Sequence, residues 1–353
     1  MSIKRLSQPL RPRKLLVIAF AIFLAIAFVA FLLVKRYVYS PILNLKSEVE
    51  YVCIPTGSDF NDVLTILSAN DRLADADAFC VMSSLMSYSS NVKPGRYKLT
   101  PKLSARSLVS ELRGGRQSSI RVTFNSVRSV GQLAGVVAQY VEADSLALIS
   151  AMSDSSILAS VGFNRCSAPA LFLPDTYDVW WTISPRGWVD KMASEYHKFW
   201  NSERLAKADS LGLSPVQVAT LASIVEEESN ILSDQKIIAG LYLNRLKIGM
   251  PMQACPTIKY ALGDFSIRRI SYQDTQVQSP YNTYINQGLP PGPIRISSKK
   301  VIDAVLNPTE SKYLYMCARP DGSGLHDFSR TLAEHQRSAN KYHRLLNNKN
   351  IYR

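Results

Sequence analysis

The sequence predicts a mixed α+β protein that an N-terminal transmembrane helix anchors to a membrane. Three features support this: an unbroken apolar segment near the N-terminus, a following region in which short β-type segments alternate with helical ones, and a C-terminal half whose helices are separated by loops rich in proline and glycine. With 353 residues, 46% of them hydrophobic and 20% charged, the chain is long enough for one membrane segment and two modest globular domains.

The apolar segment runs from Leu15 to Val34 and contains no charged residue. As a helix it would span the hydrocarbon core of a bilayer, which is about 30 Å thick, at a rise of about 1.5 Å per residue. A cleaved signal peptide is the alternative, but its apolar region is normally about 7 to 15 residues long, and no clear small-residue cleavage site precedes Lys35. We expect an uncleaved transmembrane helix at 15–34, a cytoplasmic N-terminus at 1–14 and a tether at 35–46.

The net charge of +13 is concentrated at the N-terminus. Residues 1–36 hold seven of the 41 basic residues and none of the 28 acidic ones, which leaves a surplus of only six for the rest of the chain. Neither a basic run with interleaved aromatic residues nor a recognition motif accompanies that surplus, so we expect no nucleic-acid partner. More basic residues precede the apolar segment than follow it, and the positive-inside rule therefore places the folded part outside the cytoplasm.

The five cysteines are widely spaced and form no C-x-x-C pair, so the sequence predicts neither a zinc site nor a redox motif. Outside the cytoplasm a bridge between Cys53 and Cys80 is conceivable, but an odd number of scattered cysteines fits small buried side chains better. The motifs of zinc metalloproteases and of serine hydrolases, H-E-x-x-H and G-x-S-x-G, are absent. We expect no metal and no cofactor.

The region at 47–118 reads as a small β-α-α-β unit. Strands are predicted at 50–55 and 96–99, helices at 60–70 and 74–86 between them, and a third helix at 104–113 that ends at Gly114-Gly115. This order resembles LysM-type glycan-binding modules, although other short α+β units would give the same pattern. Residues 119–353 form the second predicted domain, which begins with a strand at 120–124 and helices at 129–141 and 144–152.

The chain's clearest helix start is Ser214-Pro215-Val216-Gln217, because serine caps, proline suits the first helical position and glutamine completes a capping box. At about 100° per residue, Glu228 falls within one apolar face of this helix, whereas Glu226 and Glu227 point elsewhere. That face contains Val218, Leu221, Ile224 and Val225. A carboxylate on a buried face has a raised pKa, as a general acid working near neutral pH requires. The alternative is a helix that ends before Glu228 and a solvated acidic run.

The segment ASIVEEES, which contains Glu228, resembles the endolytic murein transglycosylase family, the MltG or YceG-like proteins. Further similar segments follow in the family's order or lie upstream: LPDTY (173–177), LNRLKIGMPMQACPTIKYALG (243–263), SPYNTYINQGLPPGPI (279–294) and KYLYMCARPDGSGLHDFSRTLAEHQ (312–336). The resemblance implies cleavage, within peptidoglycan glycan strands, of the β-1,4 bond between N-acetylmuramic acid (MurNAc) and N-acetylglucosamine (GlcNAc), which leaves 1,6-anhydroMurNAc ends. It also implies a bacterial inner-membrane location, a catalytic domain in the periplasm or extracytoplasmic space, and peptidoglycan synthases as partners.

In that resemblance Glu228 matches the catalytic glutamate, and Glu226 matches the glutamate that accompanies it. Sugar recognition needs aromatic faces together with amides and hydroxyls, so the matching segments offer further substrate-binding candidates. These are Asp175, Gln253, Tyr281, Asn282, Thr283 and Tyr284. The turn Gly288-Leu289-Pro290-Pro291-Gly292 is expected to form one wall of the cleft.

The chain departs from the family pattern at three places. Cys255 stands where an aspartate is usual, Asp327 where a threonine is common, and Pro169-Ala170 where an acidic residue and glycine often occur. Two other functions stay open: a muramidase that adds water, and a non-catalytic scaffold that binds the cell wall through the LysM-like unit. Hydrolases that retain or invert configuration need two carboxylates beside the glycosidic bond. The cleavage that forms a 1,6-anhydroMurNAc end needs only one acid, because the substrate supplies the attacking groups.

Overall fold

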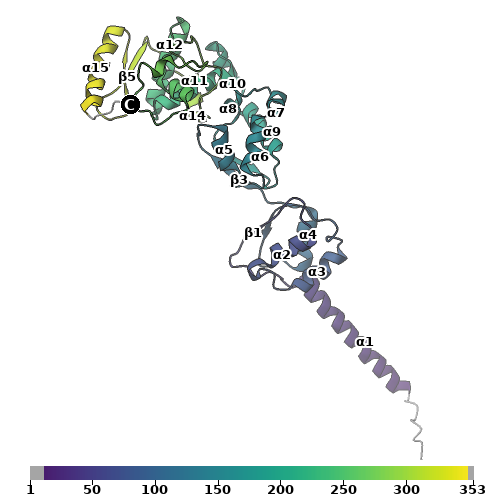
Figure 1. Ribbon diagram of the computed structural model, residues 1–353. Helices are drawn as coiled ribbons and strands as arrows, with labels where there is room; N and C mark the ends of the chain where they lie inside the picture. Colours follow the sequence, from purple (N-terminus) through teal and green to yellow (C-terminus); the bar gives the residue numbers. More distant parts are fainter. Residues whose placement is uncertain (1–11, 349–353) are drawn as a thin grey trace, which may run out of the picture. The chain divides into compact units, whose positions relative to one another are not determined.

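The computed structural model describes residues 12–348 and has a mixed α+β fold (Figure 1). Its strands form three two-stranded sheets, and helices make up most of the remainder. The chain divides into two units. The first extends to Ile120 and includes Trp180–Thr182, and the second comprises Arg121–Val179 and the chain from Ile183 onward.

The apolar N-terminal segment is a helix, as predicted. Helix α1 spans Pro12–Val34 and continues into a π-helical turn at Lys35–Tyr39. Its side chains are exposed, and the stretch Arg13–Tyr39 is long and apolar enough to cross a membrane. Among the described residues it is the one unbroken helix with these properties.

The first unit has the predicted β-α-α-β order. Strand β1 pairs antiparallel with β2, and Val52 lies opposite Tyr97, so both side chains face the same core. Asp59 and Asp75 cap the two intervening helices, and Gly115, with φ 65°, ends the helix that follows in the left-handed conformation that glycine adopts easily. The elements are β1 (Glu50–Ile54), α2 (Phe60–Ser68), a 3₁₀ turn (Ala69–Asp71), α3 (Ala76–Leu85), β2 (Gly95–Leu99) and α4 (Ala105–Gly114).

The second unit begins with strand β3, which pairs with β4. Phe124 of β3, Tyr177 of β4 and Trp188 of the long helix α9 pack their rings together, which ties the sheet to the helices beside it. The elements are β3 (Ile120–Phe124), α5 (Val130–Val137), α6 (Ser145–Ser153), α7 (Ser155–Ser160), α8 (Ala168–Leu171), β4 (Asp175–Val179) and α9 (Pro185–Phe199).

Helix α11 lies among the helices that follow, and it packs against α12, α13 and α14 (Figure 1). It begins with the predicted capping box between Ser214 and Gln217 and ends at Glu228. The predicted apolar face is buried, but burial is not confined to one face, because every residue from Val218 to Val225 is buried. The elements here are α10 (Ser202–Ser210), α11 (Pro215–Glu228), α12 (Leu232–Lys247), α13 (Cys255–Leu262) and α14 (Lys299–Leu306).

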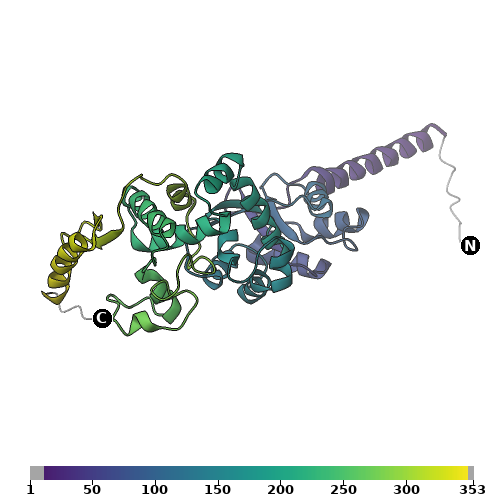
Figure 2. The same cartoon turned by 90° about the horizontal axis from the view of Figure 1, so that it is seen from above.

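The chain then forms a short hairpin and a long helix. A 3₁₀ turn at Asp274–Gln276 lies in the long loop before α14, and strands β5 (Tyr315–Ala318) and β6 (His326–Ser329) pair antiparallel. Helix α15 (Leu332–Asn348) packs against both strands and lies beside them in both views (Figure 2). Cys53 and Cys80 are not joined by a disulfide bond.

Candidate active site

The side chain of Glu228 lines a pocket of about 660 Å³. The pocket walls come from α12, α15, the hairpin β5–β6 and the loops around residues 252–255 and 268–275. Because Glu228 is the last residue of α11, it is carried by a helix whose middle, Val218–Val225, is buried, and it opens into the pocket at the helix end. The predicted alternative, a helix that ends before Glu228, is wrong.

Burial raises the pKa of Glu228 above its ordinary value. Three groups act in the opposite direction: the Tyr242 hydroxyl, which donates a hydrogen bond to Glu228 Oε1 at 2.9 Å, and the charges of His326 and Lys259. The negative end of the α11 dipole also disfavours a carboxylate at the last residue of a helix. The protonated acid is therefore favoured over a wider pH range than for a solvated glutamate.

Glu228 is the only residue with a carboxyl side chain among the described residues that line this pocket. The remaining walls consist of neutral polar, aromatic, apolar and basic side chains. A pocket of this composition can donate a proton from one group, but it offers no second carboxylate to act as a nucleophile or to activate water.

The two neighbouring glutamates have different partners and lie outside the pocket lining. Glu226 accepts a hydrogen bond from the backbone N–H of Ser298 at 3.1 Å, and Glu227 binds Arg295 at 2.7 Å and Arg128 at 3.2 Å. Their carboxylates therefore tie α11 to two other segments of the second unit. The contact with substrate that was predicted for Glu226 has no counterpart in this arrangement.

Gln253 and Tyr284 are the two substrate-binding candidates that share the pocket with Glu228. Gln253 has φ 51°, a left-handed conformation that is costly for a residue with a Cβ. Its N–H donates to the carbonyl of Thr283 at 3.0 Å, which helps to hold this conformation. The Tyr284 hydroxyl lies 3.3 Å from Cys255 Sγ, and burial raises the pKa of this tyrosine, so it stays protonated.

Asn282 and Thr283 are buried and serve the loops instead of facing the pocket. The Asn282 amide donates to the carbonyls of Thr275 and Val277, while its oxygen accepts from the N–H of Tyr284. Thr283 Oγ1 accepts from the backbone N–H of Ala254 at 3.0 Å. These two side chains therefore fix the loops that present Gln253 and Tyr284.

The remaining candidates are not brought to the pocket. Tyr281 packs on Tyr260 with ring centroids 4.7 Å apart, and Asp175 binds Lys299, which lowers the pKa of Asp175. The turn at 288–292 does not wall the pocket either, which corrects the prediction made for it. A Cβ on Gly292 would overlap the carbonyl oxygen of Cys166, so this glycine permits a close approach of two backbone segments.

Two features of the site escaped the sequence analysis. Arg245 is buried in α12 and donates to the carbonyls of Leu314, Pro251 and Met252, so one guanidinium joins β5 to the loop of Gln253. An arginine two positions after the apolar run Ile237–Leu243 was the available indication.

The second feature is the pairing of His326, which lines the pocket, with Asp234. The Nδ1 atom of His326 lies 2.7 Å from Asp234 Oδ2, and both residues are buried. Burial acts to raise the pKa of Asp234, but hydrogen bonds with His326 and Ser229, together with the charge of His326, outweigh it and leave the pKa lowered. These residues are 92 positions apart, so no local pattern reveals the contact.

The fold and the pocket define an α+β protein with an N-terminal apolar helix and a pocket lined by one carboxylic acid among the described residues. Residues 52–341 match the model of the YceG-like family, and the chain belongs to this family. A crystal structure of a YceG-like protein from Listeria monocytogenes is similar, with a TM-score of 0.55 and 28% identity, and the match covers 82% of this chain and 98% of that one.

Relatives from two bacterial species carry the name endolytic murein transglycosylase. The protein of Bacillus subtilis strain 168 is 28% identical over 307 residues, which cover 82% of this chain and 83% of that protein. The protein of Streptococcus pneumoniae strain D39 is 27% identical, and the match covers 92% of this chain and 66% of that protein.

Proposed function

We propose that this chain is an endolytic lytic transglycosylase that cuts the MurNAc–GlcNAc β-1,4 bond within nascent peptidoglycan strands and leaves 1,6-anhydroMurNAc ends. One observation carries the proposal: a single carboxylic acid with a raised pKa lines a pocket in which it is the only carboxyl side chain among the described residues. The names of the bacillary and streptococcal relatives support the same activity.

Glu228 acts first as an acid and then as a base in this mechanism. Its proton moves to the glycosidic oxygen, the bond from MurNAc C1 to that oxygen breaks, and the acetamido oxygen of the substrate stabilises C1. The Glu228 carboxylate then takes the proton of the C6 hydroxyl as O6 bonds to C1. The proton returns to Glu228 and no water is consumed, so the reaction needs no second carboxylate.

The other pocket residues position the acid and the sugar. Tyr242 holds the carboxyl group through its hydrogen bond and stabilises the anion that forms after the first step. Gln253 and Tyr284 offer an amide and an aromatic ring to the sugar. Asp234 fixes the orientation of the His326 ring, much as a buried carboxylate orients an imidazole in other sites.

Mass analysis of the products tests the proposal. Purified uncross-linked strands are incubated with the protein, and the new ends are compared with those of a muramidase digest. The wild type is expected to produce anhydro ends, which are lighter by one water than the reducing ends of the muramidase digest. The Glu228→Gln variant is expected to produce no anhydro ends. Reducing ends would instead identify a hydrolase, and strand binding without cleavage would identify a scaffold.

The first unit and the apolar helix complete the proposal. Residues 47–118 form a LysM-like glycan-binding module, a role supported by their β-α-α-β order. Helix α1 anchors the chain in the bacterial inner membrane with the catalytic part in the periplasm or extracytoplasmic space, close to peptidoglycan synthases, where cleavage would end or release new strands. Removing 47–118 from the Glu228→Gln protein and measuring strand binding tests the module.

A further inference from the structure

A second hollow lies on the other side of helix α15 from the Glu228 pocket. Leu332, His335, Ala339 and Tyr342 of α15 line the Glu228 pocket, whereas Glu334, Arg337, Ser338 and Lys341 line the second hollow. Successive residues of a helix are rotated by about 100°, so these two sets lie on different sides of α15. The two hollows are thus separated by the width of one helix.

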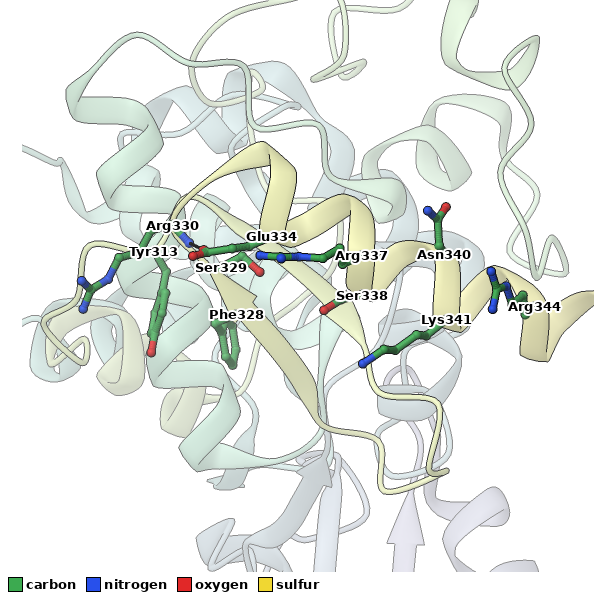
Figure 3. Close-up of a pocket in the computed structure, with 10 residues that line it drawn as sticks. All are labelled: Tyr313, Phe328, Ser329, Arg330, Glu334, Arg337, Ser338, Asn340, Lys341 and Arg344. Carbon is green, nitrogen blue, oxygen red and sulfur yellow. Dashed lines mark hydrogen bonds between the residues drawn. The ribbon is translucent and has the colours of Figure 1, made fainter.

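The second hollow, of about 790 Å³, is strongly basic, and we call it the basic groove. Arg337, Lys341 and Arg344 follow one another along one side of α15, and Arg330 lies just before the helix (Figure 3). The single acid among the described residues of the lining is Glu334, whose carboxylate accepts hydrogen bonds from the backbone N–H groups of Arg330 and Thr331. An excess of positive charge therefore faces the groove.

This pattern differs from the other solvated helices of the second unit. Helix α9 pairs Lys191 with Glu195, and α10 pairs Lys207 with Glu203, each at a spacing of four residues. In α15 no acidic residue lies three or four positions from Lys341 or Arg344. Lys341 and Arg344 thus face a groove without the intrahelical neutralisation that an ordinary solvated face has. Arg337 differs, because backbone hydrogen bonds lower the pKa of Glu334 and the charge of Arg337, three residues away, lowers it further.

The groove also offers flat and polar surfaces beside the charges. The rings of Tyr313 and Phe328 lie together with centroids 5.6 Å apart, and Ser338 and Asn340 add a hydroxyl and an amide (Figure 3). Guanidinium and ammonium groups next to aromatic rings suit a chain that combines carboxylates with apolar side chains, as an acidic peptide does.

We propose that the basic groove binds the carboxylates of the peptides that MurNAc residues carry, while the glycan strand occupies the Glu228 pocket. This inference rests on the proposed function. A peptide on a bound sugar can span the distance across α15 from the Glu228 pocket to the basic groove. A helix with its side chains is about 10–12 Å wide, and an extended peptide advances about 3.3–3.6 Å per residue. A peptide of four or five residues attached to a bound sugar therefore reaches across α15. The groove makes the enzyme selective for strands that still bear peptides.

Strand binding measures this selectivity without requiring cleavage. The full chain carrying Glu228→Gln is titrated with soluble uncross-linked strands that bear peptides and with the same strands after their peptides have been removed. The test variant adds Arg337→Gln, Lys341→Gln and Arg344→Gln. The matched control adds Arg121→Gln, Lys247→Gln and Lys300→Gln, which remove the same charge from exposed positions outside both hollows.

Peptide-bearing strands should bind the parent about tenfold more tightly than bare strands, because exposed charge pairs each contribute a few-fold. The test variant should reduce that ratio below about threefold and leave the affinity for bare strands unchanged, while the control keeps the parent ratio. The ratio should also shrink as salt is added.

The inference would be overturned if the test variant bound both kinds of strand as the parent does, or if it lost affinity for both to the same extent. Neither strand carries a lipid diphosphate, so a groove made for that anion would give the first of these results. Cleavage by the wild type separates the two hypotheses: without anhydro ends the proposed function fails, whereas the binding ratio still decides the role of the groove.

Discussion

Replacing Tyr242 with phenylalanine tests how the protein sets the acidity of Glu228. The substitution keeps the buried ring and removes the hydroxyl that donates to Glu228 Oε1 at 2.9 Å. A hydrogen bond to a charged group contributes about 1.5–3 kcal/mol, and one pKa unit corresponds to about 1.36 kcal/mol. Because this hydroxyl favours the carboxylate, its loss should raise the pKa of Glu228 further.

The assay is the pH dependence of kcat/KM on uncross-linked strands. Activity requires protonated Glu228, so the alkaline limb follows its pKa in the free enzyme and should move upward by about one to two pH units. Tyr284→Phe is the control, since its hydroxyl contacts Cys255 Sγ and not Glu228. An alkaline limb that stays in place or moves to lower pH in Tyr242→Phe would refute the reasoning, as would an equal shift in the control.

Three further outcomes are expected from thermal or urea unfolding. Because the folded pKa of Glu228 is raised, wild-type stability falls as the pH rises through it, and Glu228→Gln should gain stability over the wild type at pH 8 and less at pH 5. Asp234 has a lowered pKa and a hydrogen bond with His326, so Asp234→Ala should lose about 2 kcal/mol at pH 7 and less below pH 4, near the ordinary carboxyl pKa. A Cβ on Gly240 would overlap a backbone carbonyl, and Gly240→Ala should destabilise by about 1–3 kcal/mol, whereas Gly135→Ala, which meets open space in helix α5, should stabilise by about 0.5–1 kcal/mol.

Local sequence rules predicted the elements of the first unit, the first elements of the second unit and helix α11. The capping box at Ser214 and Gln217, the strand Ile120–Phe124 and the left-handed end of α4 at Gly115 follow from residues within one or two turns of one another. The environment of α11 was misjudged, because a periodicity argument assumes that one face of a helix meets water. Helices packed around its middle remove that condition, and its serine and threonine satisfy their hydroxyls within the unit.

The candidate site was predicted only in part for a related reason. The sequence identified which segments carry polar and aromatic side chains, but not which of those side chains face the pocket. Asn282 and Thr283 suit sugar binding by chemistry, yet each is buried with loop contacts that leave it no place in the lining. Tyr242 resembled an ordinary core tyrosine until the fold placed its hydroxyl beside Glu228.

The sequence by itself determined the apolar N-terminal helix and the order of helices and strands in the first unit, since these depend on residue type and short-range spacing. It also determined Glu228 as the acid to test, through its position in the helix and the family resemblance of the segment around it. Tertiary structure alone decided that Glu228 stands as the single carboxyl group in its pocket, that His326 meets Asp234, and that α15 separates the pocket from a basic groove. Such arrangements depend on contacts between residues far apart in the chain. Packing and desolvation fix those contacts, and no local pattern encodes them.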